Sequence, residues 1–170
     1  QELIDLTADG ILQVANGLFS PGQEGYLEDN GFDPAQDLEG ARALIAEYQA
    51  ENPGPVQVQY GITVTNINGQ TAELLQGYWE EIGVETSITQ IPQDQYITLA
   101  LFGAPEYEMF GWRSHGGTVV DSQYLWWHSS SAAPDGELSL NFARLRDPII
   151  DENLDLARGE EPQGVGATSL

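Results

Sequence analysis

Cysteine and lysine are both absent from this chain of 170 residues. Without cysteine there are no disulfide bonds and no thiolate chemistry. The strongly basic side chains are five arginines against 27 aspartates and glutamates, which gives a formal net charge of −22. Such a surface repels phosphate backbones and anionic lipid head groups, so binding to nucleic acid or to a membrane surface is not expected. An acidic coat serves solubility, and it is a common adaptation to salty surroundings.

Long apolar segments are also missing. No run approaches the ~20 apolar residues that span a bilayer, and the first residues show neither the basic start nor the apolar block of a signal peptide. The chain starts at Gln1, inside a helix-like pattern, rather than with methionine. We therefore expect a processed or excised piece of a longer protein. Its composition, 41% hydrophobic and 19% charged, is typical of a globular domain.

Strand and helix patterns alternate along most of the chain. Strict alternation of apolar and polar residues predicts a strand over 56–64, and apolar residues at helical spacing predict a helix over 37–51. By the same criteria we expect helices at 2–15, 70–83, 92–105 and 147–159, strands at 84–91 and 107–112, and a turn at 66–69. Strands that alternate with helices become parallel neighbours joined by right-handed crossovers. The predicted fold class is therefore α/β, a layered sheet flanked by helices.

The predicted elements each carry an apolar face that we expect to pack in the core. The expected inward residues are Leu38, Ala41, Leu44, Ile45 and Tyr48 in the helix over 37–51; Val56, Val58, Tyr60, Ile62 and Val64 in the strand over 56–64; Ala72, Leu75, Trp79 and Ile82 in the helix over 70–83; and Ile150, Leu154 and Ala157 in the last helix. Together these faces predict one hydrophobic layer between helices and sheet.

Aromatic and titratable residues gather in "GWRSHGGTVVDSQYLWWHSSS", residues 111–131, which holds three of the four tryptophans and both histidines. Ligands of open α/β sheets bind beyond the carboxyl ends of the strands, and the predicted strand 107–112 ends at Trp112. An indole followed by a polar, Gly-rich loop suits a surface that stacks on a ligand. The residues expected to bind the ligand are Trp112, Arg113, Ser114, His115, Asp121 and Tyr124. Leu125 and one of the adjacent Trp126 and Trp127 are expected in the core, with the other tryptophan at a rim or interface.

Signatures of other chemistries are absent. There is no G-x-S-x-G and no complete phosphate-binding loop. His115 and His128 lie thirteen residues apart, without the i, i+4 spacing of a strong metal site. Accordingly we assign no catalytic residue, no metal and no cofactor.

Four segments, in order, resemble one protein family: "DGILQVANGLFSPGQEGYL", "FDPAQDLEGARALIAEYQ", the long run from "TAELLQGYWEEIG" to "YEMFGWRS", and "DSQYLWWHSSS" with "NFARLRDPIIDENLDLARGEEP". They span about residues 5 to 162. The family is that of the family 5 extracellular solute-binding proteins, the peptide, nickel and oligosaccharide receptors of ABC importers. The likeness is to the second of their two lobes, of the periplasmic-binding-protein type II kind.

The resemblance implies a domain organisation and a function. It implies a helix leading into the lobe at 1–16, the ligand-binding lobe at 17–162, a disordered tail at 163–170, and a first lobe of the same protein that is not in this sequence. The protein would be a non-enzymatic receptor that closes on a small solute, a peptide or an oligosaccharide, and delivers it to a membrane permease. It would lie outside the cytoplasm, with a lipoprotein anchor on the complete protein.

The resemblance also carries over to single residues. Trp112 matches the tryptophan of the family's "gW", and Asp121 with Ser122 matches a later "DP". An acid that meets the amino end of a bound peptide is missing, because His115 stands near its place. This departure leaves the ligand open.

Three alternatives remain at this point. A nickel-type receptor of the same family would use His115. A hydrolase would need Asp121 and His115 within hydrogen-bond reach of Ser114 or Ser122. An interaction domain would bury Trp126 or Trp127 against a protein partner.

Overall fold

The computed structural model describes residues 3–5, 14–15, 17–31, 35–112 and 120–159. The chain divides into two compact units. The sheet unit comprises Gln1–Val14, Pro34–Thr98 and Pro105–Trp112, and the C-terminal unit comprises Ala15–Asp33, Leu99–Ala104 and Arg113–Leu170. The expected helix at 2–15 is described only at residues 3–5, which are helical, and the tail at 163–170 lies outside the described residues.

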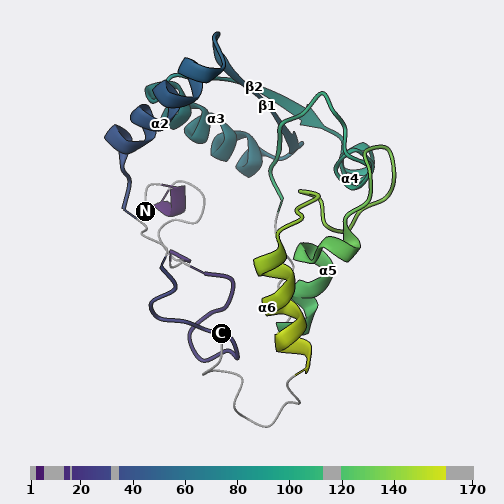
Figure 1. Cartoon of the computed structure of the whole chain (residues 1–170). Helices are drawn as coiled ribbons and strands as arrows, with labels where there is room; N and C mark the ends of the chain where they lie inside the picture. Colours follow the sequence, from purple (N-terminus) through teal and green to yellow (C-terminus); the bar gives the residue numbers. More distant parts are fainter. Residues whose placement is uncertain (1–2, 6–13, 16, 32–34, 113–119, 160–170) are drawn as a thin grey trace. The chain divides into compact units, whose positions relative to one another are not determined.

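A parallel three-stranded sheet forms the centre of the sheet unit. Its strands are β1 (Val56–Thr63) and β2 (Val84–Ile91), both labelled in Figure 1, and the short β3 (Met109–Phe110). Their spatial order is β2-β1-β3. β1 and β2 pair along their full length, from Val56 with Val84 to Thr63 with Ile91. The parallel α/β class is confirmed. β3 is shorter than expected, because only Met109 and Phe110 pair with β1, at Tyr60 and Gly61.

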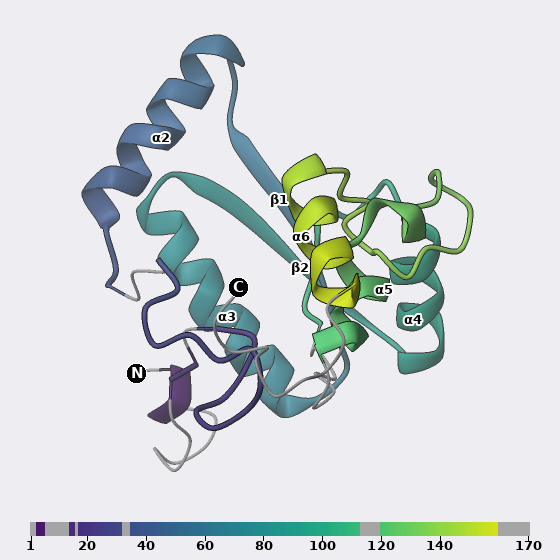
Figure 2. The same ribbon diagram turned by 60° about the horizontal axis from the view of Figure 1, so that its bottom comes forward.

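Helix α3 (Asn66–Glu81) covers one face of the sheet, beside the paired strands (Figure 2). Its buried Ala72 packs with Tyr60 and Ile62 of β1, and Leu75 and Trp79 close the same cluster. The Tyr60 and Trp79 rings meet edge to face, with centroids 5.5 Å apart. This apolar face was predicted from the 3.6-residue period and is confirmed.

The start of α3 differs from the prediction. Asn66 to Gly69 form the first helical turn instead of a separate turn. The reason is the preceding threonine: the Thr65 side chain accepts a hydrogen bond from the Asn68 N–H at 3.1 Å and so caps the helix. Asn and Gly are typical of turns, but a capped first turn accommodates both.

Helix α2 (Leu38–Glu51) is only partly packed. Asp37 caps its start by accepting from the Gly40 N–H, and the Arg42 Nε donates to the Glu81 carbonyl at the end of α3. The predicted inward stripe is wrong at two positions, since Leu44 is 68% exposed and Tyr48 is 54% exposed. A helical stripe spans a wide arc, and the described residues half-bury Leu38, Ala41 and Ile45 but leave the rest of the stripe exposed.

Helix α4 (Gln93–Phe102) starts in the sheet unit, where Tyr96 packs on the face of the sheet opposite to α3. Tyr96 meets the Phe110 ring edge to face, and Phe110 in turn lies against Gly61. The chain therefore moves from β1 to β2 over one face and from β2 to β3 over the other. This reversal makes the gap between β1 and β3 a topological switch point of the sheet.

The C-terminal unit contains short helices and one long one. They are η1 (Val120–Gln123), α5 (Tyr124–Trp127), η2 (Ser129–Ser131) and α6 (Pro148–Gly159). Asp147 begins α6 by accepting from the Ile149 and Ile150 N–H groups. As predicted, Ile150, Leu154 and Ala157 form its less exposed side. The prediction that Leu125 is buried is wrong, since it is 49% exposed.

A buried polar residue holds the loop between α5 and α6. Asn141 is fully buried and donates to the carbonyl oxygens of Trp127, His128 and Leu145 at 3.0 to 3.3 Å. Its own side-chain oxygen accepts from the Leu145 N–H. One amide thus satisfies four backbone groups in a region without regular pairing.

Candidate ligand-binding site

The carboxyl ends of β1 and β3 define the candidate site in the sheet unit. Gly111 continues the pairing past β3, because its N–H donates to the Gly61 carbonyl at 3.0 Å. Trp112 follows directly and is partly exposed. The indole therefore stands at the switch point, where open α/β sheets bind their ligands.

Tyr96 supports this indole from behind. The two rings are stacked, with centroids 5.9 Å apart and planes 10° apart. Tyr96 is 2% exposed, and its hydroxyl donates to the Gly111 carbonyl at 2.6 Å. Burial, and secondarily the nearby Tyr60, raises the pKa of Tyr96, so the hydroxyl stays a proton donor at neutral pH. Tyr96 therefore holds this part of the chain in two ways: its ring stacks on the Trp112 indole, and its hydroxyl binds the carbonyl of the preceding residue, Gly111.

Gly111 fits the space beside Tyr60 because it lacks a side chain. A Cβ at this position would lie 2.7 Å from the Tyr60 hydroxyl oxygen. Tyr60 is itself buried in the core, and burial raises the pKa of its hydroxyl. The close approach of this backbone to a core side chain fixes the point at which the chain leaves the sheet.

A second cluster surrounds Tyr124 in the C-terminal unit. The His128 ring stacks on it, with centroids 4.2 Å apart and planes 10° apart. The guanidinium carbon of Arg158 lies 3.7 Å from the centroid of the Tyr124 ring. The Tyr124 hydroxyl donates to Asp155 of α6 at 3.2 Å. Both the ring and the hydroxyl of Tyr124 therefore contact residues of this unit.

Asp121 is also engaged inside the C-terminal unit. Both of its carboxylate oxygens accept hydrogen bonds from the Arg158 guanidinium. This hydrogen bonding, reinforced by the positive charge of Arg158, lowers the pKa of Asp121. A carboxylate held ionised by an arginine is a weak general base, which makes Asp121 a poor candidate for the hydrolase mechanism.

His128 has a structural environment rather than that of a metal ligand. It is 9% exposed, and its Nδ1 accepts from the Ser130 N–H at 3.0 Å. Its Nε2 lies 3.5 Å from Asp155 and 3.8 Å from Asp151. No group of three or more potential metal ligands occurs among the described residues.

The predicted site residues fall into three groups. Trp112 lies at the end of the sheet, as expected. Asp121 and Tyr124 belong to the C-terminal unit, where they contact Arg158. Arg113, Ser114 and His115 lie outside the described residues.

Two supporting residues were not anticipated from the sequence. Tyr96 was placed in a helix without a role, although an aromatic residue soon after a helix start was a visible signal. Arg158 stands 37 residues after Asp121, and no local spacing connects the two.

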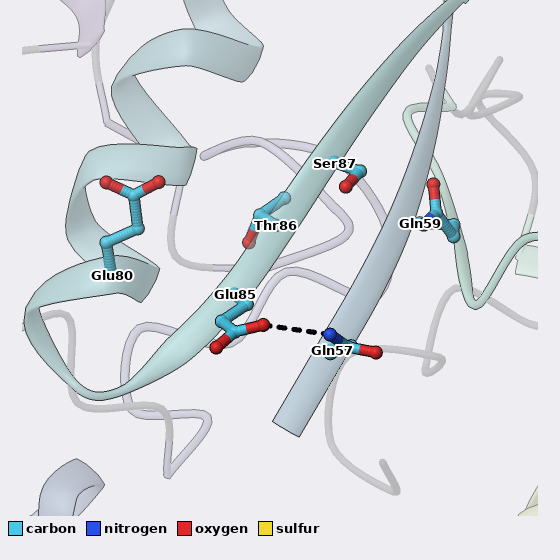
Figure 3. Close-up of a pocket in the computed structure, with 6 residues that line it drawn as sticks. All are labelled: Gln57, Gln59, Glu80, Glu85, Thr86 and Ser87. Atoms are coloured by element: carbon cyan, nitrogen blue, oxygen red, sulfur yellow. Dashed lines mark hydrogen bonds between the residues drawn. The ribbon is translucent and has the colours of Figure 1, made fainter. Parts of the chain in front are cut away.

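A separate hollow lies near the amino ends of β1 and β2 (Figure 3). It has a volume of about 300 Å³ and is lined by Gln57, Gln59, Glu80, Glu85, Thr86 and Ser87. Gln57 donates to the Glu85 carboxylate across the two strands at 2.8 Å. This hollow is at the opposite end of the strands from Trp112, so it does not belong to the strand-end site.

Comparison with known proteins identifies the family. Residues 1–135 match the family described as "Bacterial extracellular solute-binding proteins, family 5 Middle", and the chain belongs to this family. The match confirms the resemblance stated from the four sequence segments. No curated protein sequence matches the chain.

Solved structures show the same fold at low sequence identity. The chain is similar to the periplasmic binding protein DppA from Helicobacter pylori in complex with the peptide STSA, with 22% identity and a TM-score of 0.78, over 98% of this chain and 31% of that one. It is similar to the oligopeptide-binding protein AppA from Bacillus subtilis in complex with a nonapeptide, with 18% identity and a TM-score of 0.78, over 98% and 34%. The nickel ABC transporter protein from Bacillus halodurans matches at 19% identity and a TM-score of 0.66, over 98% and 35%.

The chain thus spans about a third of the length of these solved proteins. Their two-lobed architecture agrees with the predicted fold class, a layered α/β piece of a larger binding protein. Among the described residues, no helix combines the length and apolar character needed to cross a bilayer.

Proposed function

We propose that this chain is part of the substrate-binding component of an ABC importer, and that it contributes the Trp112 surface to a cleft between two lobes. The complete protein would close on a small solute and deliver it to a membrane permease. It would act outside the cytoplasm, held by a lipoprotein anchor. The family membership supports the receptor class, and the strand-end position of Trp112 supports the location of the surface.

The observation that carries the proposal is the supported indole. Trp112 is partly exposed, and its ring is backed by the buried Tyr96. A fixed aromatic face binds a ligand without first losing its own conformational freedom. Peptide backbones and sugar rings both offer flat apolar patches that pack on an indole, so the surface suits either solute class.

Asp121 and Tyr124 are proposed to take part less directly than Trp112. Both are held by Arg158 in the described structure. Through Arg158 they would anchor η1 and α5, the elements in which they lie, to α6. Arg113, Ser114 and His115 remain proposed ligand contacts.

A binding experiment in the complete receptor tests the proposal. We expect Trp112→Ala to weaken binding of a peptide or oligosaccharide pool at least tenfold, or about 1.4 kcal/mol, in isothermal titration calorimetry. Trp112→Phe keeps a ring for the Tyr96 stack and should retain most of the affinity. Tyr48→Ala, on the exposed side of α2, is the matched control and should bind like the unmodified protein. Equal affinity of Trp112→Ala and the control would overturn the proposed site.

The isolated chain gives a second test. Because a ligand favours closure only by touching both lobes, one lobe alone should bind weakly. We expect no micromolar binding to the chain by itself, and such binding would contradict the two-lobe account.

A nickel chelate is the second candidate ligand, favoured by the similarity to the nickel transporter protein. Titration with Ni²⁺ and free histidine, with His115→Ala as the comparison, distinguishes it from peptide binding. Nickel-dependent heat that is lost in His115→Ala would assign the receptor to metal chelates.

A further inference from the structure

A buried histidine lies between α5 and α6 in the C-terminal unit. His128 follows α5 directly and is 9% exposed. Its backbone is held on both sides, because its N–H donates to the Tyr124 carbonyl at 2.9 Å and its carbonyl accepts from the Asn141 side chain at 3.3 Å. Figures 1 and 2 both show α5 beside α6. The imidazole ring is therefore fixed in position, and its two nitrogens have different neighbours.

One nitrogen of the ring caps the short helix η2. The His128 Nδ1 accepts a hydrogen bond from the Ser130 N–H at 3.0 Å, and it lies 2.8 Å from the Ser130 hydroxyl oxygen. A backbone N–H can only donate, so Nδ1 carries no proton in this arrangement. The proton of the neutral ring is therefore on Nε2.

The other nitrogen has no hydrogen-bond partner within the described part of the chain. Nε2 of His128 is buried, and two carboxylate oxygens of α6 lie near it, of Asp155 at 3.5 Å and of Asp151 at 3.8 Å. Both distances exceed the ordinary hydrogen-bond range of about 2.7–3.2 Å. A buried N–H without an acceptor is unfavourable, whereas a positive charge at the same place is attracted by nearby carboxylates.

Asp151 stays ionised in the pH range where a histidine changes charge. The Ser129 hydroxyl and N–H donate to its carboxylate, and these hydrogen bonds lower the pKa of Asp151. Histidine side chains take up a proton between about pH 8 and pH 5. A protonated His128 therefore faces a full negative charge on α6.

Two arginines lie close to this cluster. Arg158 rests on the ring of Tyr124, which itself stacks on His128. Arg146 donates to the Ala132 carbonyl. Within the residues that the structure describes, neither arginine has a nitrogen within 4.0 Å of the two carboxylates near Nε2. Neither carboxylate is therefore already paired with a guanidinium.

We propose that His128 is a proton-operated switch in the C-terminal unit. In the neutral ring, Nδ1 caps η2 by accepting from the Ser130 N–H. When Nδ1 takes up a proton from water it becomes a donor, so the bond from this N–H is lost, while the Ser130 hydroxyl turns and accepts. Nε2–H, now part of a cation, forms a charge-assisted hydrogen bond of about 2.7–2.9 Å to Asp155 or Asp151. Acid thus exchanges the cap of η2 for an ion pair with α6.

The change is confined to η2 and its junction with α6. Ser129 stays bound to Asp151, and the Ser131 carbonyl stays bound to the Ser139 hydroxyl. Only the middle residue of η2 is therefore released. On acidification to about pH 5, we expect a looser η2 and a firmer contact between α5 and α6.

Nitrogen NMR of the whole chain tests the switch without a substitution at the switch itself. At about pH 8 the ring signals of His128 should report the Nε2–H tautomer. As the ring gains its proton, the Ser130 amide signal should shift with the same midpoint. Comparison with His115→Gln, which leaves His128 as the single histidine, assigns the ring signals. An Nδ1–H tautomer at pH 8, or a Ser130 amide that does not respond to the ring, would overturn the proposal.

A locked variant tests the role of the cap. His128→Asn keeps a side-chain oxygen that accepts from the Ser130 N–H, since asparagine is a good N-cap, but it cannot take up a proton. We expect the pH-dependent shift of the Ser130 amide to be lost in this variant. A shift of the same size as in the unmodified chain would contradict the switch.

A matched pair of variants on α6 tests the ion pair. Asp155→Asn keeps an acceptor for the Tyr124 hydroxyl but removes a charge that favours the protonated ring, so the midpoint of the Ser130 shift should move lower by at least about 0.5 pH unit. Glu152→Gln removes the same charge from an exposed position of the same helix and should move the midpoint by less than half as much. An equal effect of the two variants would show that total charge, and not the contact with Asp155, acts on the ring.

Discussion

The backbone of Gly111 passes so close to Tyr60 that a Cβ on this glycine would lie 2.7 Å from the tyrosine hydroxyl oxygen. The contact joins the core of the sheet unit to the residue that precedes Trp112. The core side chain of Tyr60 therefore lies directly against the backbone that carries the proposed ligand surface.

Replacement of Gly111 tests this close contact. We expect Gly111→Ala to lower the free energy of unfolding by about 1–3 kcal/mol, since the added methyl overpacks the site. Tyr60→Phe removes the clashing oxygen, so the double variant should recover at least ~1 kcal/mol of that loss. Urea denaturation of the four proteins of the cycle gives the coupling energy, and strictly additive effects would contradict the contact.

Asn141 should be among the most sensitive positions of the C-terminal unit. Asn141→Ala leaves four buried or half-buried backbone groups without their partner, and we expect a loss of about 3 kcal/mol in unfolding free energy. Asn153→Ala is the control, because its amide donates to Ile149 on an exposed helix surface. The control should stay within about 0.5 kcal/mol of the unmodified chain.

The hydrogen bonds between Ser129 of η2 and Asp151 of α6 should be sensitive to acid. The Ser129 hydroxyl and N–H donate to its carboxylate and lower its pKa. A depressed folded-state pKa contributes stability that is complete above about pH 4 and is lost as pH falls through the folded value. Asp151→Asn should therefore be destabilised at pH 7 and less sensitive to acid.

The measurement for Asp151 is the thermal midpoint between pH 7 and pH 2. Glu152→Gln, at the next position and exposed, changes the charge equally without removing the link. Identical pH profiles for the two variants would refute a role for the Ser129 hydrogen bonds.

For Tyr96 we expect the opposite pH dependence: the stability that it contributes is lost at high pH. Its pKa is raised, mainly by burial, so unfolding releases its proton once the pH exceeds about 10. Stability from this group is present below that pH and is lost above it. At pH 7 we expect Tyr96→Phe to lower the free energy of unfolding by about 1–2 kcal/mol, because the hydrogen bond to Gly111 is lost. Above about pH 10 the free energy of unfolding of this variant should decrease less steeply than that of the unmodified chain. Tyr48→Phe, on an exposed tyrosine, should follow the unmodified chain in both respects.

The regular part of the fold followed from sequence because its signals are local. The helical stripe with Ala72 and Trp79 depends on residues a few positions apart and was correct. The alternation in β1 was correct only in its first part: Gly61, expected to face outward, is buried, and Val64, expected to face inward, lies beyond the strand and is 57% exposed. The exposed Leu44 and Tyr48 were not anticipated, because a stripe records an apolar side and not what covers it. The length of β3 could not be predicted from its own residues either, because it depends on how many of them pair with β1.

The candidate site was predictable only where it follows a strand. The strand-end position of Trp112 was expected because this residue comes directly after the apolar run of β3, and its contact with a ligand stays a prediction. The engagement of Asp121 with Arg158 joins residues far apart in the chain, and no pattern in the sequence connects a surface aspartate to one arginine. The stack of Trp112 on Tyr96 likewise depends on α4 crossing to the other face of the sheet.

The strand order also has a consequence for synthesis on the ribosome. β1 emerges first but is the middle strand in space, and it gains its second neighbour only when Met109 and Phe110 have been translated. At 5–20 residues per second, the stretch from Ile91 to Phe110 takes roughly one to four seconds. During that time one border of β1 is open to pairing with another nascent chain, so the translation rate through α4 sets how long the protein is exposed to misassembly.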